Sequence, residues 1–147
     1  MTSQVVTAAR QWIGTPYVHQ ASKRGAGCDC LGLIRGVWRE TLGAEPEAVP
    51  AYSADWSETG SEEALWMASA RHLQAKALAD VEAGDVLLFR MRDNGVAKHL
   101  GIQACLGGQP SFIHAYAGHA VVESPLSAPW ARRIMARFAF PNKETSA

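Results

Sequence analysis

The chain has 147 residues, the size of one ordinary domain, and we expect a single domain over residues 1–147. Hydrophobic residues make up 48% of it and charged residues 19%, which is typical of a folded globular protein and argues against a disordered one. Fourteen basic and fourteen acidic residues cancel to a net charge of zero, so the charge pattern expected of a nucleic-acid-binding protein is missing. We expect no membrane insertion, because no run reaches the roughly 18 apolar residues that a spanning helix needs.

The N-terminal segment predicts a helix. Ser3 precedes a run in which apolar residues recur at helical spacing as far as Ile13. Gly14 and Pro16 then end that helix, and a polar loop over residues 22–27 follows. This segment has neither the charged start nor the apolar run of a signal peptide, so we expect synthesis in the cytoplasm and release by another route.

The next segment predicts a second helix, from Cys30 to about residue 42. Asp29 is a good N-cap for it, and Gly43 is a typical C-terminal stop. Gly32 and Gly36 each weaken such a helix by about 1 kcal/mol relative to alanine. We therefore expect the two glycines to allow close packing, with the sheet as the partner.

The second half of the chain predicts strands. Before them, residues 44–60 are typical of an ordered loop, and Ser61 opens a third helix to about residue 73. Asp93-Asn94-Gly95 predicts a tight turn. Short connections favour an antiparallel meander, so we expect an α+β domain with helices packed on a sheet of five to six strands. The predicted strands cover residues 86–89, 98–105, 111–116, 120–123 and 133–140.

The three cysteines raise the question of thiol reactivity. An odd number is poor evidence for a disulfide framework, and Cys28 and Cys30 lie too close in sequence for an easy bridge. Cys30 falls in the first turn of a helix, where a cysteine's usual pKa of about 8.5 is lowered. A zinc site is disfavoured, because one C-x-C pair lacks the usual ligand spacing. We expect Cys105 to pack in the core.

Two of the five histidines fall in consecutive predicted strands. His99 starts one strand and His114 lies in the next, so a tight hairpin would place both rings on one face. A catalytic thiol needs a base close to the sulfur and a third group that orients the base. Cys30, His99 and His114 are of the right types. His19, His72 and His119 are interpreted as surface residues.

Five short motifs occur along the chain in a characteristic order. They are Gly14-Thr15-Pro16-Tyr17, Asp29-Cys30-Leu31-Gly32-Leu33, Gly84-Asp85-Val86, His99-Leu100-Gly101-Ile102 and Ile113-His114-Ala115. This pattern resembles the NlpC family of papain-like cell-wall cysteine peptidases, over a core of about residues 4–140. The most similar subgroup is the compact type associated with phage tails and gene-transfer particles.

The resemblance implies a role for each matching residue. Cys30 would be the nucleophile, His99 its base and His114 the residue that holds the imidazole. Tyr17 would line the cleft near the oxyanion, and Asp29 would meet the amino end of the substrate. The implied reaction hydrolyses an amide bond in a peptidoglycan stem peptide without a metal or other cofactor.

One position departs from the family pattern. Most members have a serine directly after the nucleophile, where it helps to bind a free amino terminus, and this chain has Leu31. A strict preference for substrates that begin with L-Ala-γ-D-Glu is therefore not expected. The resemblance further implies phage-like tail proteins as partners and delivery to the cell wall or periplasm in a particle.

Two other classes of function fit the same residues. The chain could be a structural tail-tip or hub domain with weak or no hydrolase activity. It could also be an acyltransferase, or an amidase on a substrate other than peptidoglycan, because a fold and a triad do not determine the substrate.

Overall fold

A computed structural model describes residues 3–46, 70–90, 97–116 and 118–141. Most of the loop expected over residues 44–60 and of the helix expected over residues 61–73 lies outside this part, and so does the turn at residues 93–95. The end of that expected helix is described, and residues 70–72 are helical.

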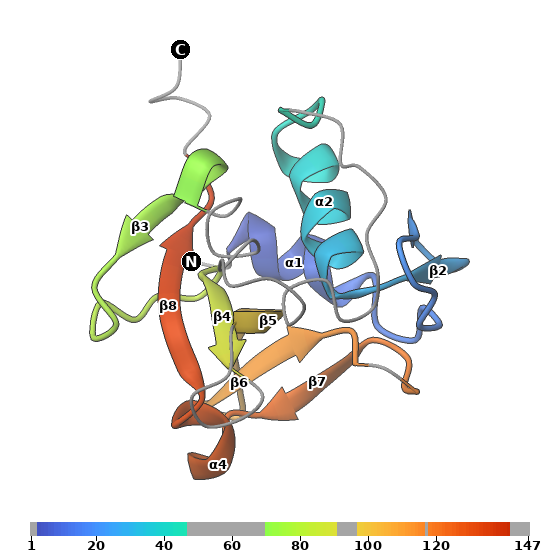
Figure 1. Cartoon of the computed structure of the whole chain (residues 1–147). Helices are drawn as coiled ribbons and strands as arrows, with labels where there is room; N and C mark the ends of the chain where they lie inside the picture. Colours follow the sequence, from blue (N-terminus) through green and yellow to red (C-terminus); the bar gives the residue numbers. More distant parts are fainter. Residues whose placement is uncertain (1–2, 47–69, 91–96, 117, 142–147) are drawn as a thin grey trace.

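The described residues form an α+β fold with one six-stranded antiparallel sheet, as expected (Figure 1). The strand order is β3-β8-β4-β5-β6-β7, and a separate small hairpin pairs β1 with β2. The elements in chain order are α1 (Gln4–Arg10), β1 (Ser22–Lys23), β2 (Gly27–Cys28), α2 (Cys30–Thr41), β3 (Gln74–Lys76), β4 (Val86–Arg90), β5 (Ala97–Leu106), β6 (Gln109–His114), β7 (Val122–Pro125), α4 (Ala128–Ala131) and β8 (Ile134–Ala139).

The sheet differs from the expected meander at its two ends. Strands β4 to β7 do follow one another as neighbours, but β8 returns to the other side of β4 and also pairs with β3, which the sequence pattern did not predict. Strand β6 starts two residues earlier than expected. Gly107 and Gly108 both have positive φ and form a two-residue turn, so pairing resumes at once between Leu106 and Gln109.

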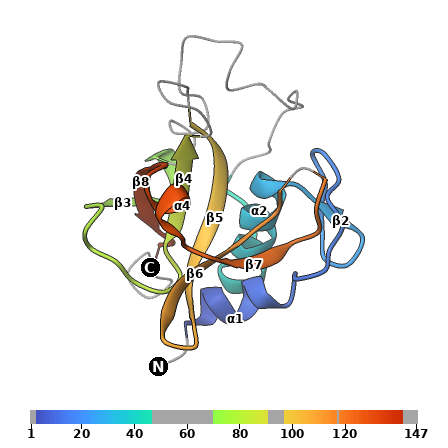
Figure 2. The same ribbon diagram turned by 90° about the horizontal axis from the view of Figure 1, so that it is seen from below.

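The two long helices begin at the predicted caps. The Ser3 hydroxyl accepts a hydrogen bond from the N–H of Val6, and the Asp29 carboxylate accepts one from the N–H of Gly32. Helix α2 ends before Gly43, which has a φ of +101°. Both helices lie on one side of the sheet, and α2 packs against β5 and α1 (Figures 1 and 2).

The glycines of α2 allow close packing, but the expected partner was wrong. A Cβ at Gly32 would collide with the carbonyl oxygen of Ala21, in the loop before β1. A Cβ at Gly36 would collide with the indole ring of Trp12, which is fully buried between the two helices. The glycines therefore bring α2 close to α1 and to the β1 loop rather than to the sheet.

Strand β4 is buried on both faces, which explains its uninterrupted apolar sequence. Val86 and Leu88 face the main core under α1 and α2. Leu87 and Phe89 face a second, smaller core on the opposite side, where the segment containing α4 covers the sheet (Figure 2). This second core consists of Leu87, Phe89, Phe112, Leu126, Trp130 and Ile134.

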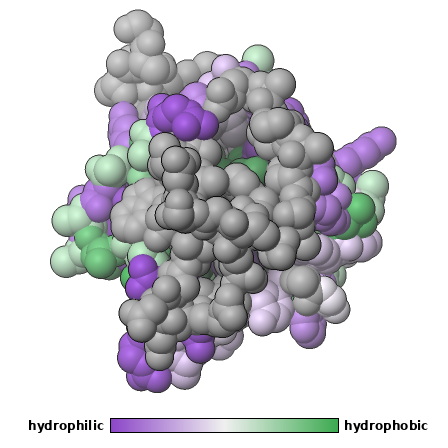
Figure 3. Space-filling model, in the orientation of Figure 1, coloured by the Kyte–Doolittle hydropathy of each residue, from purple (hydrophilic) through white to green (hydrophobic). Residues whose placement is uncertain are grey.

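Apolar side chains on the surface are scattered. Leu78 and Val81 are exposed in the connection between β3 and β4, and Figure 3 shows hydrophobic atoms at that side of the molecule among hydrophilic ones. Among the described residues, no helix is both long and apolar enough to cross a membrane.

Candidate active site

His99 and His114 lie in adjacent strands and contact each other directly. Nε2 of His99 is 2.9 Å from Nδ1 of His114, a hydrogen-bond distance between two rings that are each about 95% buried. They share the sheet face of Phe112, which lies two residues before His114. The prediction that the hairpin brings these two histidines together is confirmed.

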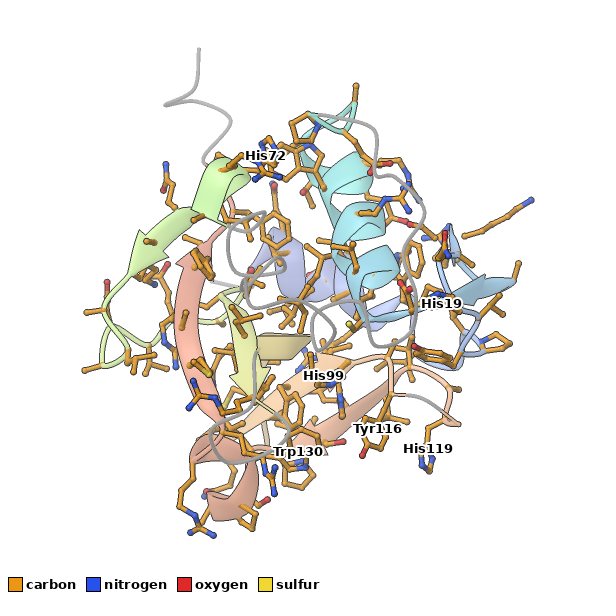
Figure 4. All side chains as sticks on the ribbon, in the orientation of Figure 1. His19, His72, His99, Tyr116, His119 and Trp130 are labelled. Atoms are coloured by element: carbon orange, nitrogen blue, oxygen red, sulfur yellow. The ribbon has the colours of Figure 1, made fainter. Side chains whose placement is uncertain are left out.

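Aromatic rings enclose the histidine pair. The ring centroid of His99 is 5.8 Å from that of Trp130 and 5.7 Å from that of Tyr116, and Phe112 lies 4.1 Å from His114. Figure 4 shows His99, Tyr116 and Trp130 gathered on the lower side of the sheet, with His119 beyond Tyr116 and His72 at the far end of the molecule. The pair therefore lies in a largely apolar environment.

This environment keeps His114 neutral. Burial lowers the pKa of His114 from 6.5 to about 4, and the nearby His119 acts in the same direction. At neutral pH the ring carries one proton, so each of its nitrogens has a fixed role as donor or acceptor. Its second nitrogen, Nε2, lies 3.1 Å from the hydroxyl of Ser124 in β7.

Where β6 stops pairing with β5, a backbone N–H next to His99 has no partner in the ladder. The last pair of that ladder joins Ile102 to Ile113. Gln103 bonds through its backbone to Asp85, on the β4 side of the strand. Because backbone groups alternate in direction along a strand, the N–H of Leu100, two residues before Ile102, points toward the β6 side beyond the last pair of the ladder.

The sulfur of Cys30 occupies this position. Cys30 is the first residue of α2 and is partly buried, and its sulfur accepts a hydrogen bond from the N–H of Leu100. Leu100 directly follows His99 in β5, so the thiol at the start of the helix meets the strand that carries the histidine. The separation along the chain is about 70 residues, and the contact between α2 and β5 closes it.

The expected low pKa of Cys30 was wrong. Burial and, to a lesser extent, the neighbouring Asp29 carboxylate together raise the pKa of the thiol to about 12. The N–H groups of Leu100, Leu31 and Cys30 itself favour the thiolate but are outweighed. The helix N-terminus does supply donors, as expected, yet desolvation is the larger effect here. Cys30 therefore rests as a neutral thiol.

Tyr17 and Asp29 lie next to the thiol. Tyr17 forms an isolated β-bridge with Cys28, and burial together with the adjacent Cys30 raises the pKa of its hydroxyl to about 12, so it stays protonated. Asp29 is buried, and its two carboxylate oxygens accept hydrogen bonds from the N–H groups of Gly32 and Gln20. Leu31 is partly buried and packs against the main core.

The other cysteines and histidines lie outside this arrangement. Cys28 is fully buried in the main core, whereas Cys105 is exposed near the β5–β6 turn, so the expectation that it packs in the core was wrong. Cys105 directly follows the buried Ala104 in β5, so its side chain points to the other face of the sheet. His19 lies 3.8 Å from Asp29, and His119 stacks on Tyr116 at the surface. Within the described ranges, no group of three or more His, Cys, Asp or Glu side chains could hold a metal ion.

Three neighbours of the histidine pair were missed in the sequence, namely Tyr116, Ser124 and Trp130. Ser124 could have been found by extending the fourth strand by one residue, because it then lies opposite Phe112. Trp130 follows a proline in a short helix, and no periodic pattern connects it to the sheet.

Comparison with solved structures supports this description of the fold. A Staphylococcus aureus Mu50 protein of the NLP/P60 family, described as similar to a lipoprotein, superimposes with a TM-score of 0.58 at 21% identity, over 94% of this chain and 41% of its own. The NlpC/p60 domain of the peptidoglycan hydrolase SagA gives 0.60 at 22%, over 95% of this chain and 100% of its own. A Bacillus cereus ATCC 10987 protein of the NlpC/P60 family gives 0.63 at 18%, over 92% and 39%.

This chain thus spans about two fifths of the length of the Staphylococcus and Bacillus proteins. A search of curated proteins finds no match. The model of the NlpC/P60 family matches residues 14–138, a range that includes Tyr17, the thiol of Cys30 and both histidines of the buried pair. The chain therefore belongs to the NlpC/P60 family.

Proposed function

We propose that this chain is a cysteine peptidase that hydrolyses an amide bond in peptidoglycan stem peptides. The observation that carries the proposal is that the thiol of Cys30 is bonded to the backbone of the strand that bears the buried, bonded pair of imidazoles. The Cys30 sulfur meets the N–H of Leu100, and the preceding residue, His99, is bonded to His114. SagA, a peptidoglycan hydrolase with the same fold, supports the choice of substrate.

The reaction begins with a neutral thiol and a neutral base. Nε2 of His99 is engaged by His114, so Nδ1 is the nitrogen that takes the proton of Cys30. As the proton leaves, the sulfur forms a bond to the substrate carbonyl carbon, and the carbonyl oxygen becomes an oxyanion. Proton transfer during attack removes the need for a free thiolate, which the raised pKa of Cys30 disfavours.

In the proposed reaction, two donors stabilise the oxyanion. The N–H of Cys30 belongs to the first turn of α2, where it has no intrahelical acceptor. The hydroxyl of Tyr17, whose pKa is raised to about 12 and which is therefore protonated at neutral pH, is the second donor. Neutral donors in a buried site stabilise a developing negative charge more strongly than they would in water.

The remaining steps return the enzyme to its starting state. Protonated His99 gives its proton to the leaving amine as the C–N bond breaks, which leaves a thioester on Cys30. Water then gives a proton to His99 while its oxygen attacks the thioester carbon. The C–S bond breaks, the proton returns to the sulfur, and the products are a new amine and a new carboxylate.

We place the amino end of the substrate near α2, where few groups are available to select it. The carboxylate of Asp29 already accepts two backbone hydrogen bonds, and Leu31 offers no hydroxyl group beside the nucleophile. We therefore propose that Asp29 acts on the amino end of the substrate through its negative charge, and that this chain accepts a wider range of amino ends. Delivery by a phage-like tail to the cell wall is part of the proposal and rests on the motif pattern alone.

The proposal is tested by digesting purified sacculi with the wild type, Cys30→Ala and Cys105→Ala. We expect new amine ends, identified by mass spectrometry, with the wild type and with Cys105→Ala, whose altered side chain is exposed. We expect none with Cys30→Ala. Equal products from all three proteins would overturn the assignment of Cys30, and no products from any of them would favour a structural tail domain. Transfer of the acyl group to an added amine, in place of hydrolysis, would indicate an acyltransferase.

A further inference from the structure

The hydrogen-bonded series that starts at His99 extends to a third residue. Nε2 of His114 is 3.1 Å from the hydroxyl oxygen of Ser124, which lies in β7 opposite Phe112. His114 is only 3% exposed, so this nitrogen is largely cut off from solvent. A buried ring nitrogen depends on the protein for its partner.

Two arrangements of the protons satisfy this series of hydrogen bonds. They differ in whether Nδ1 of His99 carries a proton. In the first, His99 donates from Nε2 to Nδ1 of His114, and His114 donates from Nε2 to Ser124; Nδ1 of His99 then has a lone pair. In the second, every proton is shifted, so that His114 donates from Nδ1 to His99, which then carries its proton on Nδ1. Only the first arrangement leaves His99 able to accept a proton from the thiol.

We propose that Ser124 is a positioning residue that holds His114 in the Nε2–H tautomer, and through it holds His99 with its lone pair on Nδ1. The inference rests on the proposed function for its catalytic consequence but not for the tautomer itself. The Ser124 hydroxyl can accept from the Nε2–H of His114 in the first arrangement and donate to Nε2 in the second. The first arrangement depends on it more strongly, because a buried N–H without an acceptor is the more costly kind of unsatisfied group.

Removal of the Ser124 hydroxyl should therefore shift the tautomer of His114 in one direction. In Ser124→Ala the Nε2–H of His114 loses its acceptor, which favours transfer of the proton to Nδ1. That nitrogen then donates to His99, and the proton of His99 moves to the nitrogen that should accept from Cys30. Ser124→Thr keeps a hydroxyl at the same place and should preserve the first arrangement.

The direct test is 15N NMR of histidine-labelled protein at pH 7.5, because protonated and unprotonated ring nitrogens have well-separated shifts. We expect the Nε2–H form of His114 in the wild type and in Ser124→Thr, and the Nδ1–H form in Ser124→Ala. Ser111→Ala is the matched control. Ser111 is a buried serine in the same pair of strands, and its hydroxyl donates to Glu123 rather than to a histidine.

Kinetics on a soluble stem peptide provide the second readout. We expect Ser124→Ala to lower kcat by about 10- to 100-fold with KM nearly unchanged, and Ser124→Thr to recover most of that loss. An Nε2–H tautomer in Ser124→Ala, or an equal loss of kcat in Ser111→Ala, would overturn the proposal. If the wild type hydrolyses no stem peptide, the proposed function fails while the tautomer measurement still decides the role of Ser124.

Discussion

The guanidinium of Arg137 in β8 donates to the carboxylate of Asp85, at the start of β4, over 2.9 Å, and both residues are almost fully buried. Lys76 of β3 donates to the other carboxylate oxygen over 2.8 Å. Arg137 also donates to the side chain of Gln103 in β5. The Asp85 carboxylate therefore links the start of β4 to β3 and β8, and Arg137 extends the link to β5, which gives the Gly84-Asp85 motif a structural role far from the histidines.

We expect Asp85→Asn to destabilise the fold by about 3–5 kcal/mol, because it leaves the buried charge of Arg137 without its counter-ion. The free energy of unfolding from urea denaturation measures this. Asp80→Asn is the control, since Asp80 is exposed and lies 4.0 Å from the same Lys76; its loss should stay below about 1 kcal/mol. A change in Asp85→Asn no larger than in Asp80→Asn would contradict the structural role.

The packing of α2 on α1 gives a second prediction. Gly36→Ala should gain about 1 kcal/mol from helix propensity, but its Cβ would collide with the rigid, buried ring of Trp12. Overpacking of this kind costs about 1–3 kcal/mol, so we expect a net loss of stability.

A double-mutant cycle with Trp12→Phe tests the cause. A smaller ring gives the added methyl group room, so the double variant should be more stable than the sum of the two single losses by about 1 kcal/mol or more. Strict additivity would show that the Gly36 substitution acts through something other than Trp12.

How much of this could be predicted from the sequence depends on the range of the interaction. The contact between His99 and His114 follows from a two-residue Gly-Gly turn and strict alternation, both of which are local, and it was predicted. The hydrogen bond from Leu100 to Cys30 requires knowing where β6 stops pairing with β5, which no local pattern gives. The raised pKa of Cys30 depends on burial by distant segments, and this outweighed the helix effect that the sequence indicated.

The lowered pKa of His114 predicts how the stability of the fold depends on pH. The pKa of this residue is about 4 in the folded protein against a usual 6.5, so the folded state binds fewer protons between these values than the unfolded state. Its contribution to stability is therefore complete above pH 6.5 and is lost as the pH falls toward 4. The difference between the two pKa values corresponds to about 3 kcal/mol.

Urea denaturation between pH 4 and 8 checks this linkage. His114→Gln has no group to titrate at this position, so its stability should fall less steeply with acid than that of the wild type. His72→Gln removes a histidine at the far end of the molecule and should keep the wild-type slope (Figure 4). Identical slopes for the wild type and His114→Gln would show that burial of this ring does not govern the acid response.

The reactivity of Cys30 should depend on His99 rather than on the helix. With a thiol pKa of about 12, Cys30 in His99→Ala should react with iodoacetamide more slowly than the exposed Cys105 of the same molecule, at every pH below about 10. In the wild type, His99 accepts the proton of the Cys30 thiol, so we expect labelling of Cys30 at pH 7.5 to be at least about 10-fold faster than in the variant. Mass spectrometry of the labelled peptides measures both sites in one sample, with Cys105 as the internal reference. Equally fast labelling of Cys30 with and without His99 would mean that the donors at the start of α2 activate the thiol unaided, and that the imidazole acts only in later steps.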